Sequence, residues 1–427
     1  MTRTGKPREL FNFPMMMSSL LFSLQNAVVV AFHFITANYF HPLPVPSSAS
    51  GKMKRIVIVG GSFAGVETAH RILKQAAKTS IAPLKITLVS RDSHFYWNIA
   101  APRGIVPGQL SDEQLFQPIA AGFSQYPSSQ FEFVLGTATG VDSVSKQLRV
   151  SEAGGKEIVL DYDFLIIGTG ASTKADTPFK SRGSTEATKQ ALHDYQARIK
   201  AAKTIAVAGA GPTGVETAGE LAFEYGHTKK IILISSSSGL LDGPARPPSI
   251  SKAAEKALQA LDVDIRLNSK VKDERQLPDS RQEIIFSSGD KVVVDMYIPA
   301  FGVKPNSSFV PAEFLDPQGF IMVDEFLAVK GASGIFALGD VSDSEPPQIL
   351  IVQGQSKHLA RNMILTLSDK PVLPYKVFPR AMMGVNIGKN SGTGHVGSLR
   401  LPSFLVAMLR RTLFVEKLPK TVDGSIL

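Results

Sequence analysis

The chain has 427 residues, of which 44% are hydrophobic and 19% are charged; its formal net charge is +9 and it has no cysteine. This length exceeds what one hydrophobic core usually supports, so we expect at least two domains, and the composition excludes a disordered chain. No run of Lys and Arg with interleaved aromatic residues occurs, so the positive charge does not predict nucleic-acid binding.

Residues 1–52 form an N-terminal extension. Three cationic residues among the first eight precede an apolar stretch at 11–40, which a Pro-rich segment closes. The stretch is long enough for a membrane span, which needs about 20 apolar residues. A cleaved targeting signal has the same pattern, and Met53 can also be the functional start, because a strand pattern follows it directly. Among these alternatives we favour a membrane anchor or a mitochondrial signal.

A glycine-rich turn follows the first predicted strand. The apolar run at 55–60 predicts a buried strand, and 64–77 predicts a helix. Such a turn before a helix N-terminus is typical of sites that seat a dinucleotide pyrophosphate on backbone N–H groups. The residues of the turn are Gly60, Gly61, Ser62, Phe63, Ala64 and Gly65. Ser62 stands at the middle glycine position, where the backbone must approach the pyrophosphate closely and a serine side chain is a small departure from glycine.

The next strands are predicted at 85–90, 131–135 and, hairpin-like, between 141 and 160. In a dinucleotide-binding unit an acidic residue usually closes the second strand and holds ribose hydroxyls. Ser90 stands there in this chain. We expect the neighbouring Arg91 or Asp92 to take over.

A second unit of the same kind follows. The sequence Gly-Val-Glu-Thr-Ala occurs at 65–69 and again at 214–218, each time closing a glycine-rich turn. The second turn comes after a predicted strand at 204–209 and has all three glycines of the fingerprint. Its residues are Gly209, Gly211, Pro212, Thr213 and Gly214. Two such units predict two nucleotides held face to face.

The second strand of this unit, 230–235, ends in Ser235 where an acidic residue is usual. A carboxylate there would repel a 2′-phosphate, whereas the serines at 235–238 can donate hydrogen bonds to it. We therefore expect NADPH to be tolerated, and the choice between NADH and NADPH stays open. A further strand is predicted near 263–267.

A third signal lies near the other end of the chain. The short apolar strand at 334–339 ends in Asp340, which can accept a hydrogen bond from a ribityl hydroxyl of FAD; an aspartate that caps the next turn is the plainer alternative. Strands at 163–170 and 296–305 run into glycine-containing turns. They would be the two crossings between an FAD domain and an inserted NAD(P) domain.

Taken in order, these motifs resemble the two-dinucleotide-binding flavoproteins of the pyridine nucleotide-disulfide oxidoreductase superfamily. Within it the chain is most similar to the apoptosis-inducing-factor-like, mitochondrion-associated group, also called ferroptosis-suppressor flavoproteins. The hints are Trp97-Asn98-Ile-Ala-Ala-Pro-Arg103 and Leu413-Phe-Val415. The resemblance implies an α/β fold of two Rossmann-like domains, with FAD and NAD(P)H as cofactors. It places the FAD domain at 53–180 and 296–367, the NAD(P) domain at 181–295 and a small C-terminal region at 368–427.

The resemblance also implies roles for single residues. Glu216 would lie beside the nicotinamide, although a first-turn acid that complements the helix dipole is an equally common interpretation. Arg103 would lie near the FAD pyrophosphate. Ala138, in an apparent turn at 136–140, would offer backbone groups to the adenine.

The members of the resembling group reduce quinones, and without cysteine the electrons must leave a flavin directly for an external acceptor. We therefore expect hydride transfer from NAD(P)H to FAD and a quinone-type acceptor. A soluble carrier such as a ferredoxin is the alternative within the enzymes, and an apoptosis-type signalling or DNA-associating flavoprotein is the alternative from another class.

The C-terminal stretch at 401–415 mixes apolar residues with Arg410 and Arg411. This pattern suits contact with an anionic lipid surface, and equally an interface helix packed on the protein. Together with residues 1–52, it favours a membrane-associated protein, mitochondrial or on a cytosol-facing membrane.

Overall fold

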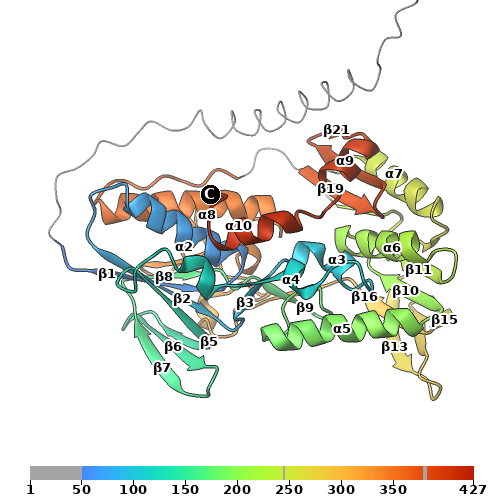
Figure 1. Ribbon diagram of the computed structural model, residues 1–427, viewed down its shortest axis with the longest axis horizontal. Helices are drawn as coiled ribbons and strands as arrows, with labels where there is room; N and C mark the ends of the chain where they lie inside the picture. Colours follow the sequence, from blue (N-terminus) through green and yellow to red (C-terminus); the bar gives the residue numbers. More distant parts are fainter. Residues whose placement is uncertain (1–50, 244–245, 378–381) are drawn as a thin grey trace, which may run out of the picture. The chain divides into compact units, whose positions relative to one another are not determined.

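The computed structural model describes residues 51–243, 246–377 and 382–427 (Figure 1). The prediction for the N-terminal extension therefore lies almost entirely outside the described residues. Among the described residues, no helix has both the length and the apolar character that crossing a bilayer requires.

The first nucleotide unit is built on a seven-stranded sheet. Its strands are β1 (Lys54–Val59), β2 (Leu84–Ser90), β5 (Phe131–Asp142), β6 (Gln147–Glu152), β7 (Glu157–Asp161), β8 (Phe164–Ile167) and β18 (Ile335–Ala337), in the order β18-β8-β1-β2-β5-β6-β7. The five strands from β18 to β5 are parallel, and β5, β6 and β7 form an antiparallel meander. Parallel strands are covered on both faces and therefore read as continuous apolar runs, as β1 does.

Two long helices, α2 (Phe63–Ala76) and α8 (Ile349–Leu367), pack side by side on this sheet (Figure 1). Helix α8 begins six residues before the predicted start at Gln355, because Ile349 and Val352 continue its apolar pattern. A short helix at the chain end, α10 (Leu418–Val422), packs on α2. His70 of α2 bonds through Nε2 to the carbonyl of Val422 at 2.8 Å, and Lys74 donates to the carbonyl of Gly424 at 2.6 Å.

Several further elements, most of them short, lie outside the first sheet. They are β3 (His94–Tyr96), β4 (Phe116–Pro118), α3 (Ala101–Gly104), α4 (Asp112–Leu115), β9 (Ala171–Thr173), α5 (Thr185–Ala201) and β17 (Val303–Pro305), with 3₁₀ helices at Asn98–Ala100, Ala120–Phe123, Ala312–Phe314 and Gly339–Val341. Strands β9 and β17 pair antiparallel. The two chain segments that run between the sheets are therefore hydrogen-bonded to each other.

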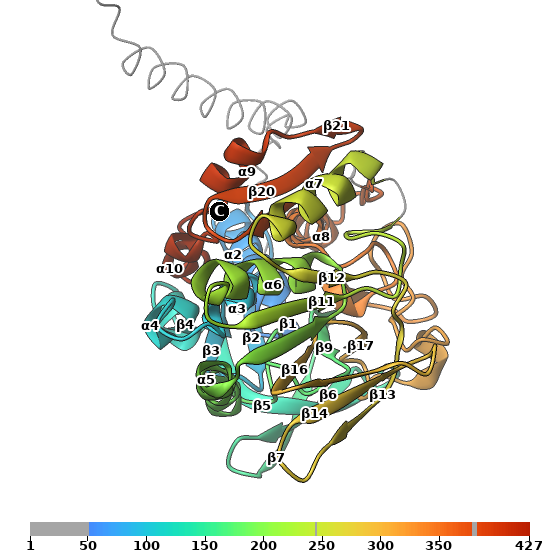
Figure 2. The same cartoon turned by 90° about the vertical axis from the view of Figure 1, so that its right-hand side faces the viewer.

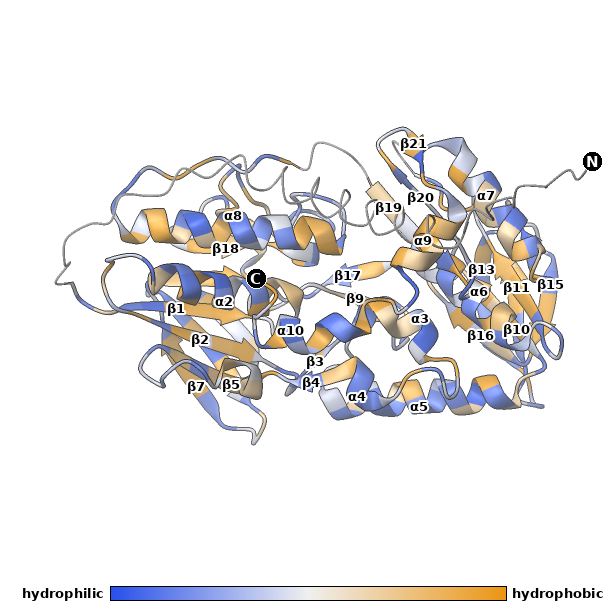
Figure 3. Cartoon of the chain, turned by 45° about the horizontal axis from the view of Figure 1, so that its top comes forward, coloured by the Kyte–Doolittle hydropathy of each residue, from blue (hydrophilic) through white to orange (hydrophobic). Residues whose placement is uncertain are grey.

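The second unit has a four-stranded parallel sheet in the order β12-β11-β10-β16 (Figure 2). The elements are β10 (Thr204–Ala208), β11 (Lys230–Ile234), β12 (Asp264–Arg266), β16 (Met296–Pro299), α6 (Pro212–Tyr225) and α7 (Pro248–Gln259), and an antiparallel sheet of β13 (Val271–Gln276), β14 (Gln282–Phe286) and β15 (Lys291–Val294). In Figure 3, β2 and β11 are largely coloured as hydrophobic.

One expected boundary needs correction. The sequence assigned residues from 296 onward to the FAD domain, yet β16 pairs with β10 from Met296 to Pro299 and belongs to the second sheet. Three of the four residues of β16 are buried, so this apolar run is the closing strand of that sheet. The crossing back to the first unit comes afterwards, through β17.

The C-terminal region consists of β19 (Met382–Ile387), β20 (Ser391–Val396), β21 (Leu399–Arg400), α9 (Ser403–Leu409), a 3₁₀ turn at Val415–Lys417 and α10. Strand β19 packs closely on α6. A Cβ atom at Gly219 of α6 would lie 2.9 Å from the Cα atom of Ile387. Glycine is required at this position because the two backbones approach each other directly.

Candidate active site

The first glycine turn has the geometry that a close strand–helix connection demands. Gly60 has a φ of +122°, which side chains other than glycine rarely tolerate. A Cβ at Gly65 would lie 1.8 Å from the carbonyl oxygen of Gly60, so the third position accepts only glycine. Ser62 precedes the first residue of α2 and its hydroxyl makes no capping hydrogen bond. The N-terminal N–H groups of α2 thus remain open to an anion.

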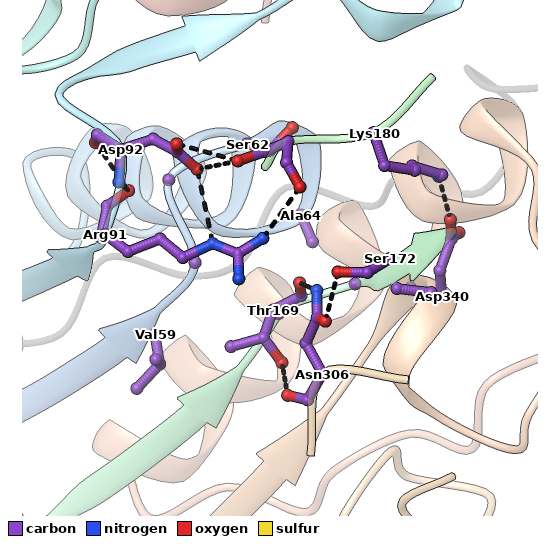
Figure 4. Close-up of a pocket in the computed structure, with 18 of the residues that line it drawn as sticks. Val59, Ser62, Ala64, Arg91, Asp92, Thr169, Ser172, Lys180, Asn306 and Asp340 are labelled. Atoms are coloured by element: carbon purple, nitrogen blue, oxygen red, sulfur yellow. Dashed lines mark hydrogen bonds and ion pairs between the residues drawn. The ribbon is translucent and has the colours of Figure 1, made fainter. Parts of the chain in front are cut away.

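This turn opens on a cavity of about 440 Å³, within the usual range of ligand sites of about 300–1,000 Å³. Figure 4 shows its wall. The predicted residues on it are Gly60, Gly61, Ser62, Phe63, Ala64, Ala138 and Asp340. The segment at 136–140 is a continuous part of β5 with an irregular register between Ala138 and Gly140, and not the expected turn.

At one end of the cavity lie the residues that the sequence predicts beside the adenosine ribose. The hydroxyl of Ser90 accepts from the N–H of Asp92 at 3.1 Å and donates to its carbonyl at 2.8 Å, so it closes a local turn. The Asp92 carboxylate accepts from the Ser181 hydroxyl at 2.8 Å, and burial raises its pKa. Arg91 also lines this wall and donates to the Ser181 carbonyl at 3.2 Å. Arg91 and Asp92, which are expected to replace the missing acidic residue, therefore both line the cavity.

The other end carries a polar network from several elements (Figure 4). Lys180 Nζ donates to the Asp340 carboxylate at 2.8 Å. The amide of Asn306 donates to the Thr169 carbonyl at 2.9 Å and accepts from the Ser172 hydroxyl at 2.7 Å. No motif marks Lys180, Ser172 or Asn306, so the sequence assigns no role to them. Thr169 lies in the predicted strand and turn at 163–170.

The second glycine turn repeats the first in its construction. Gly209 has a φ of +110°, and a Cβ at Gly214 would lie 1.7 Å from the Gly209 carbonyl oxygen. Gly211 differs, since a Cβ there would meet no atom within 4 Å. Pro212 and Thr213 begin α6, and Phe301, half exposed, lies over Gly209. The space beside Gly211 is therefore free for a ligand.

Ser235 is placed differently from the expectation. Its hydroxyl donates to the Gly239 carbonyl at 3.1 Å and accepts from the Ser237 N–H at 3.2 Å, and the residue is 2% exposed. A hydroxyl engaged on both sides has no free donor for a 2′-phosphate. Ser235 thus shapes the turn at the end of β11, and its hydroxyl does not read the coenzyme directly in this geometry.

Glu216 lies in the first turns of α6 and is buried. Its carboxylate accepts from Arg410 Nη2 at 2.7 Å and from the Asn386 N–H at 3.2 Å. Burial raises the pKa of Glu216, and Arg410 opposes that rise. Arg410 therefore faces into the protein, which favours, at this residue, the alternative of an interface packed on the protein. No sequence pattern indicated this pairing.

Arg103 also departs from the prediction. It does not line the cavity, and its guanidinium binds both carboxylate oxygens of Glu220, Nε to Oε2 at 2.9 Å and Nη2 to Oε1 at 2.7 Å. Arg103 therefore lies against Glu220 of α6 and not, as predicted, beside the FAD pyrophosphate. A buried guanidinium needs a carboxylate partner, and α6 supplies it.

Two glycine turns on parallel sheets, one beside a ligand-sized cavity, define a protein with two dinucleotide sites. The chain belongs to the pyridine nucleotide-disulphide oxidoreductase family, whose model matches residues 54–356. It is an oxidoreductase with the cofactors FAD and NAD(P)H, and the free helix N-terminus, the glycine cradle and the cavity fit such groups.

Among known proteins, the chain is 62% identical to the oxidoreductase ptaL of Pestalotiopsis fici over 375 residues, which cover 88% of this chain and all of the relative. It is 30% identical to ferroptosis suppressor protein 1 of Taeniopygia guttata, over 87% of this chain and 96% of the relative. The solved sulfide:quinone oxidoreductase of Aquifex aeolicus shares the fold, with a TM-score of 0.70 at 18% identity, over 87% of this chain and 92% of that one.

Proposed function

We propose that the protein is an FAD-dependent NAD(P)H oxidoreductase that reduces a quinone-type acceptor without a redox cysteine. The observation that carries this proposal is the pairing of two glycine turns of the same construction in a chain with no cysteine. FAD supplies the redox chemistry when bound, because it accepts a hydride from NAD(P)H and passes two electrons to a second acceptor.

The first turn and its cavity are the proposed FAD site. The N–H groups at the start of α2 would hold the pyrophosphate, since Gly60 and Gly65 let the backbone approach closely. Arg91 and Asp92 would hold the adenosine ribose. Asp340, held in place by Lys180, would accept hydrogen bonds from the ribityl chain.

The second turn is the proposed NAD(P)H site. The residues from Gly209 to Gly214 would bind the pyrophosphate at the N-terminus of α6, and the open space beside Gly211 supports this. Glu216 lies one helical turn further on. Its carboxylate would orient the nicotinamide, with Arg410 and the Asn386 N–H holding it in position.

The acceptor is an external one, because the chain has no thiol that could receive electrons. A quinone takes up two electrons and two protons to become a hydroquinone, so one reduced flavin suffices for one turnover. The similarity to the ferroptosis-suppressor flavoproteins supports a quinone. The net charge of +9 favours an acidic soluble carrier as the second candidate.

We further propose that the protein works at a membrane surface. The exposed apolar side chains of the C-terminal region include Leu399 (69%), Phe404 (63%) and Met408 (40%), and Arg400 and Arg411 lie near them in the chain. Apolar side chains flanked by cations suit an anionic lipid interface. Deletion of residues 1–52 tests the second anchor that the sequence predicts.

The experiment is an anaerobic stopped-flow study of the full-length holoprotein. We expect NADH or NADPH to bleach the flavin rapidly, and a short-chain soluble benzoquinone to restore its colour at a similar rate. Reoxidation by a ferredoxin but not by the quinone would establish the soluble-carrier alternative. A flavin that neither coenzyme bleaches would refute the oxidoreductase assignment of the two turns.

For the membrane, purified protein is mixed with anionic vesicles at rising salt. We expect full-length protein to co-sediment, the form without residues 1–52 to bind less and to lose binding as salt screens the cations, and both forms to keep activity with the soluble quinone. Full-length protein that stays in the supernatant at low salt contradicts membrane attachment.

A further inference from the structure

Three buried charged side chains and one partly buried one meet where three parts of the chain come together. Arg103 lies on α3, Glu216 and Glu220 lie one turn apart on α6, and Arg410 follows α9. The side chains of Arg103 and Glu220 are 6% and 2% exposed, and they form two hydrogen bonds. Figures 1 and 2 show α3 beside α6. We call Arg103, Glu216, Glu220 and Arg410 the ionic joint.

The segment at 410–414 is tied to both nucleotide units. Arg103 Nη1 donates to the carbonyl of Arg411 at 2.6 Å, and Trp97 Nε1 donates to the carbonyl of Leu413 at 2.9 Å, both from the first unit. Arg410 pairs with Glu216 of the second unit. The same short segment thus bonds to Trp97 and Arg103 on one side and to the helix that follows the second glycine turn on the other.

The backbone of this segment is strained. Leu413 and Phe414 both have left-handed conformations, with φ of 51° and 59°, which are unfavourable for residues other than glycine. Such strain persists only where surrounding contacts fix the chain, and it is concentrated at functional sites. Here the contacts are the hydrogen bonds from Trp97 to the Leu413 carbonyl and from Arg103, a member of the ionic joint, to the Arg411 carbonyl.

The joint connects the two turns through short paths. Trp97 packs against Phe63 of the first turn, with ring centroids 5.1 Å apart, and Arg103 lies six residues after Trp97. Glu220 is on the helix that begins at the second turn. The Arg103–Glu220 pair therefore links the segment that packs on the first turn to the helix that begins at the second turn.

From this arrangement we propose that Arg103 is a positioning residue for hydride transfer: through Glu220 and the Arg411 carbonyl, it sets the distance and angle between the two nucleotide sites. The inference rests on the proposed function, in which NAD(P)H reduces the flavin directly. A bidentate guanidinium–carboxylate pair fixes direction as well as distance. Buried ion pairs often add little net stability over apolar groups of similar size, so orientation is what the pair contributes here.

The test uses the holoprotein with Arg103→Met and Glu220→Met combined, which leaves no buried charge unpaired. We expect its FAD content and its dissociation constant for NADH to stay within about twofold of the unmodified protein, while the limiting rate of flavin reduction falls by about 10- to 100-fold, since a misplacement of about 1 Å can cost about 10²-fold. Arg103→Lys keeps the positive charge but cannot form the bidentate pair, so it should give an intermediate limiting rate of flavin reduction.

The matched control is Arg275→Met with Glu283→Met, an ion pair within the antiparallel sheet of the second unit, and it should leave the limiting rate unchanged. A limiting rate within about twofold of the unmodified protein in the Arg103/Glu220 variant would overturn the inference. Parallel loss of FAD, NADH affinity and rate would also overturn it, since the pair would then only hold the fold. If neither coenzyme reduces the flavin of the unmodified protein, the proposed function itself fails.

Discussion

Replacing Gly211 by valine should abolish coenzyme binding and spare the flavin. Gly211 has a φ of −73° and an extended ψ, which valine adopts readily, and a Cβ at this position meets no protein atom within 4 Å. The variant should therefore fold normally. Its side chain would occupy the space that the pyrophosphate needs against the N-terminus of α6.

The size of the effect follows from the contacts that the valine would block. Two backbone N–H groups that bind a charged pyrophosphate contribute about 1.5–3 kcal/mol each. Losing both costs about 3–6 kcal/mol, which raises the dissociation constant for NADH by about 10²- to 10⁴-fold. Gly214→Ala is the contrasting variant, because its Cβ would lie 1.7 Å from the Gly209 carbonyl and must displace the turn itself.

The assay measures FAD released on denaturation and the dependence of flavin bleaching on NADH concentration. For Gly211→Val we expect full FAD content, an unchanged unfolding temperature and no saturation with NADH. For Gly214→Ala we expect a lowered unfolding temperature as well. A Gly211→Val protein that binds NADH normally would show that the pyrophosphate lies elsewhere, and one that has lost FAD would show that the two sites are exchanged.

Three further predictions concern other parts of the molecule. Burial lowers the pKa of His70 to about 4, so between pH 6.5 and about 4 the unfolded chain binds a proton that the folded chain does not. The free energy of unfolding should therefore fall by about 3 kcal/mol as the pH falls over this interval. In urea titrations, the free energy of unfolding of His70→Gln should depend less steeply on pH. An equal slope in both proteins would contradict the assignment. Asp340→Ala should raise the dissociation constant of FAD at least about tenfold, because Lys180 loses its carboxylate partner and the ribityl chain loses a hydrogen-bond acceptor worth about 1.5–3 kcal/mol. The measurement is the FAD retained on dialysis. Full retention would show that Asp340 does not belong to the site. Because the Ser235 hydroxyl is engaged within the turn at the end of β11, Ser235→Ala should leave the ratio of the activities with NADPH and NADH unchanged, and a loss with NADPH alone would show that this hydroxyl contacts the coenzyme.

The sequence predicted what local sterics dictate. Both glycine turns were found because Gly60 and Gly209 need positive φ and because Gly65 and Gly214 have no room for a Cβ. The predicted fold class was also confirmed, because parallel strands covered on both faces appear in the sequence as continuous apolar runs. Glycine proved misleading only at 136–140, where it accompanies an irregular strand register rather than a turn.

What the sequence could not predict are the partners of charged groups. Arg103 was expected at a pyrophosphate and Arg410 at a lipid surface, yet each pairs with a glutamate of α6 more than a hundred positions away along the chain. No periodicity or spacing links such residues, because the pairing arises when three segments pack together. Lys180 was missed for the same reason, as its carboxylate partner Asp340 belongs to a distant loop.

The order of strands in the first sheet has a consequence for synthesis of the chain. The edge strand β18 and the helix α8 come after the whole second unit in sequence, and the end of the chain closes on α2 through His70 and Lys74. The second sheet uses only residues 204–299 and can form as soon as these emerge from the ribosome. The first sheet lacks its edge strand β18 and the covering helix α8 until residues 335–367 have been made. A chain that stops before β18 would therefore leave the edge of β8 unpaired and α2 without its neighbour α8.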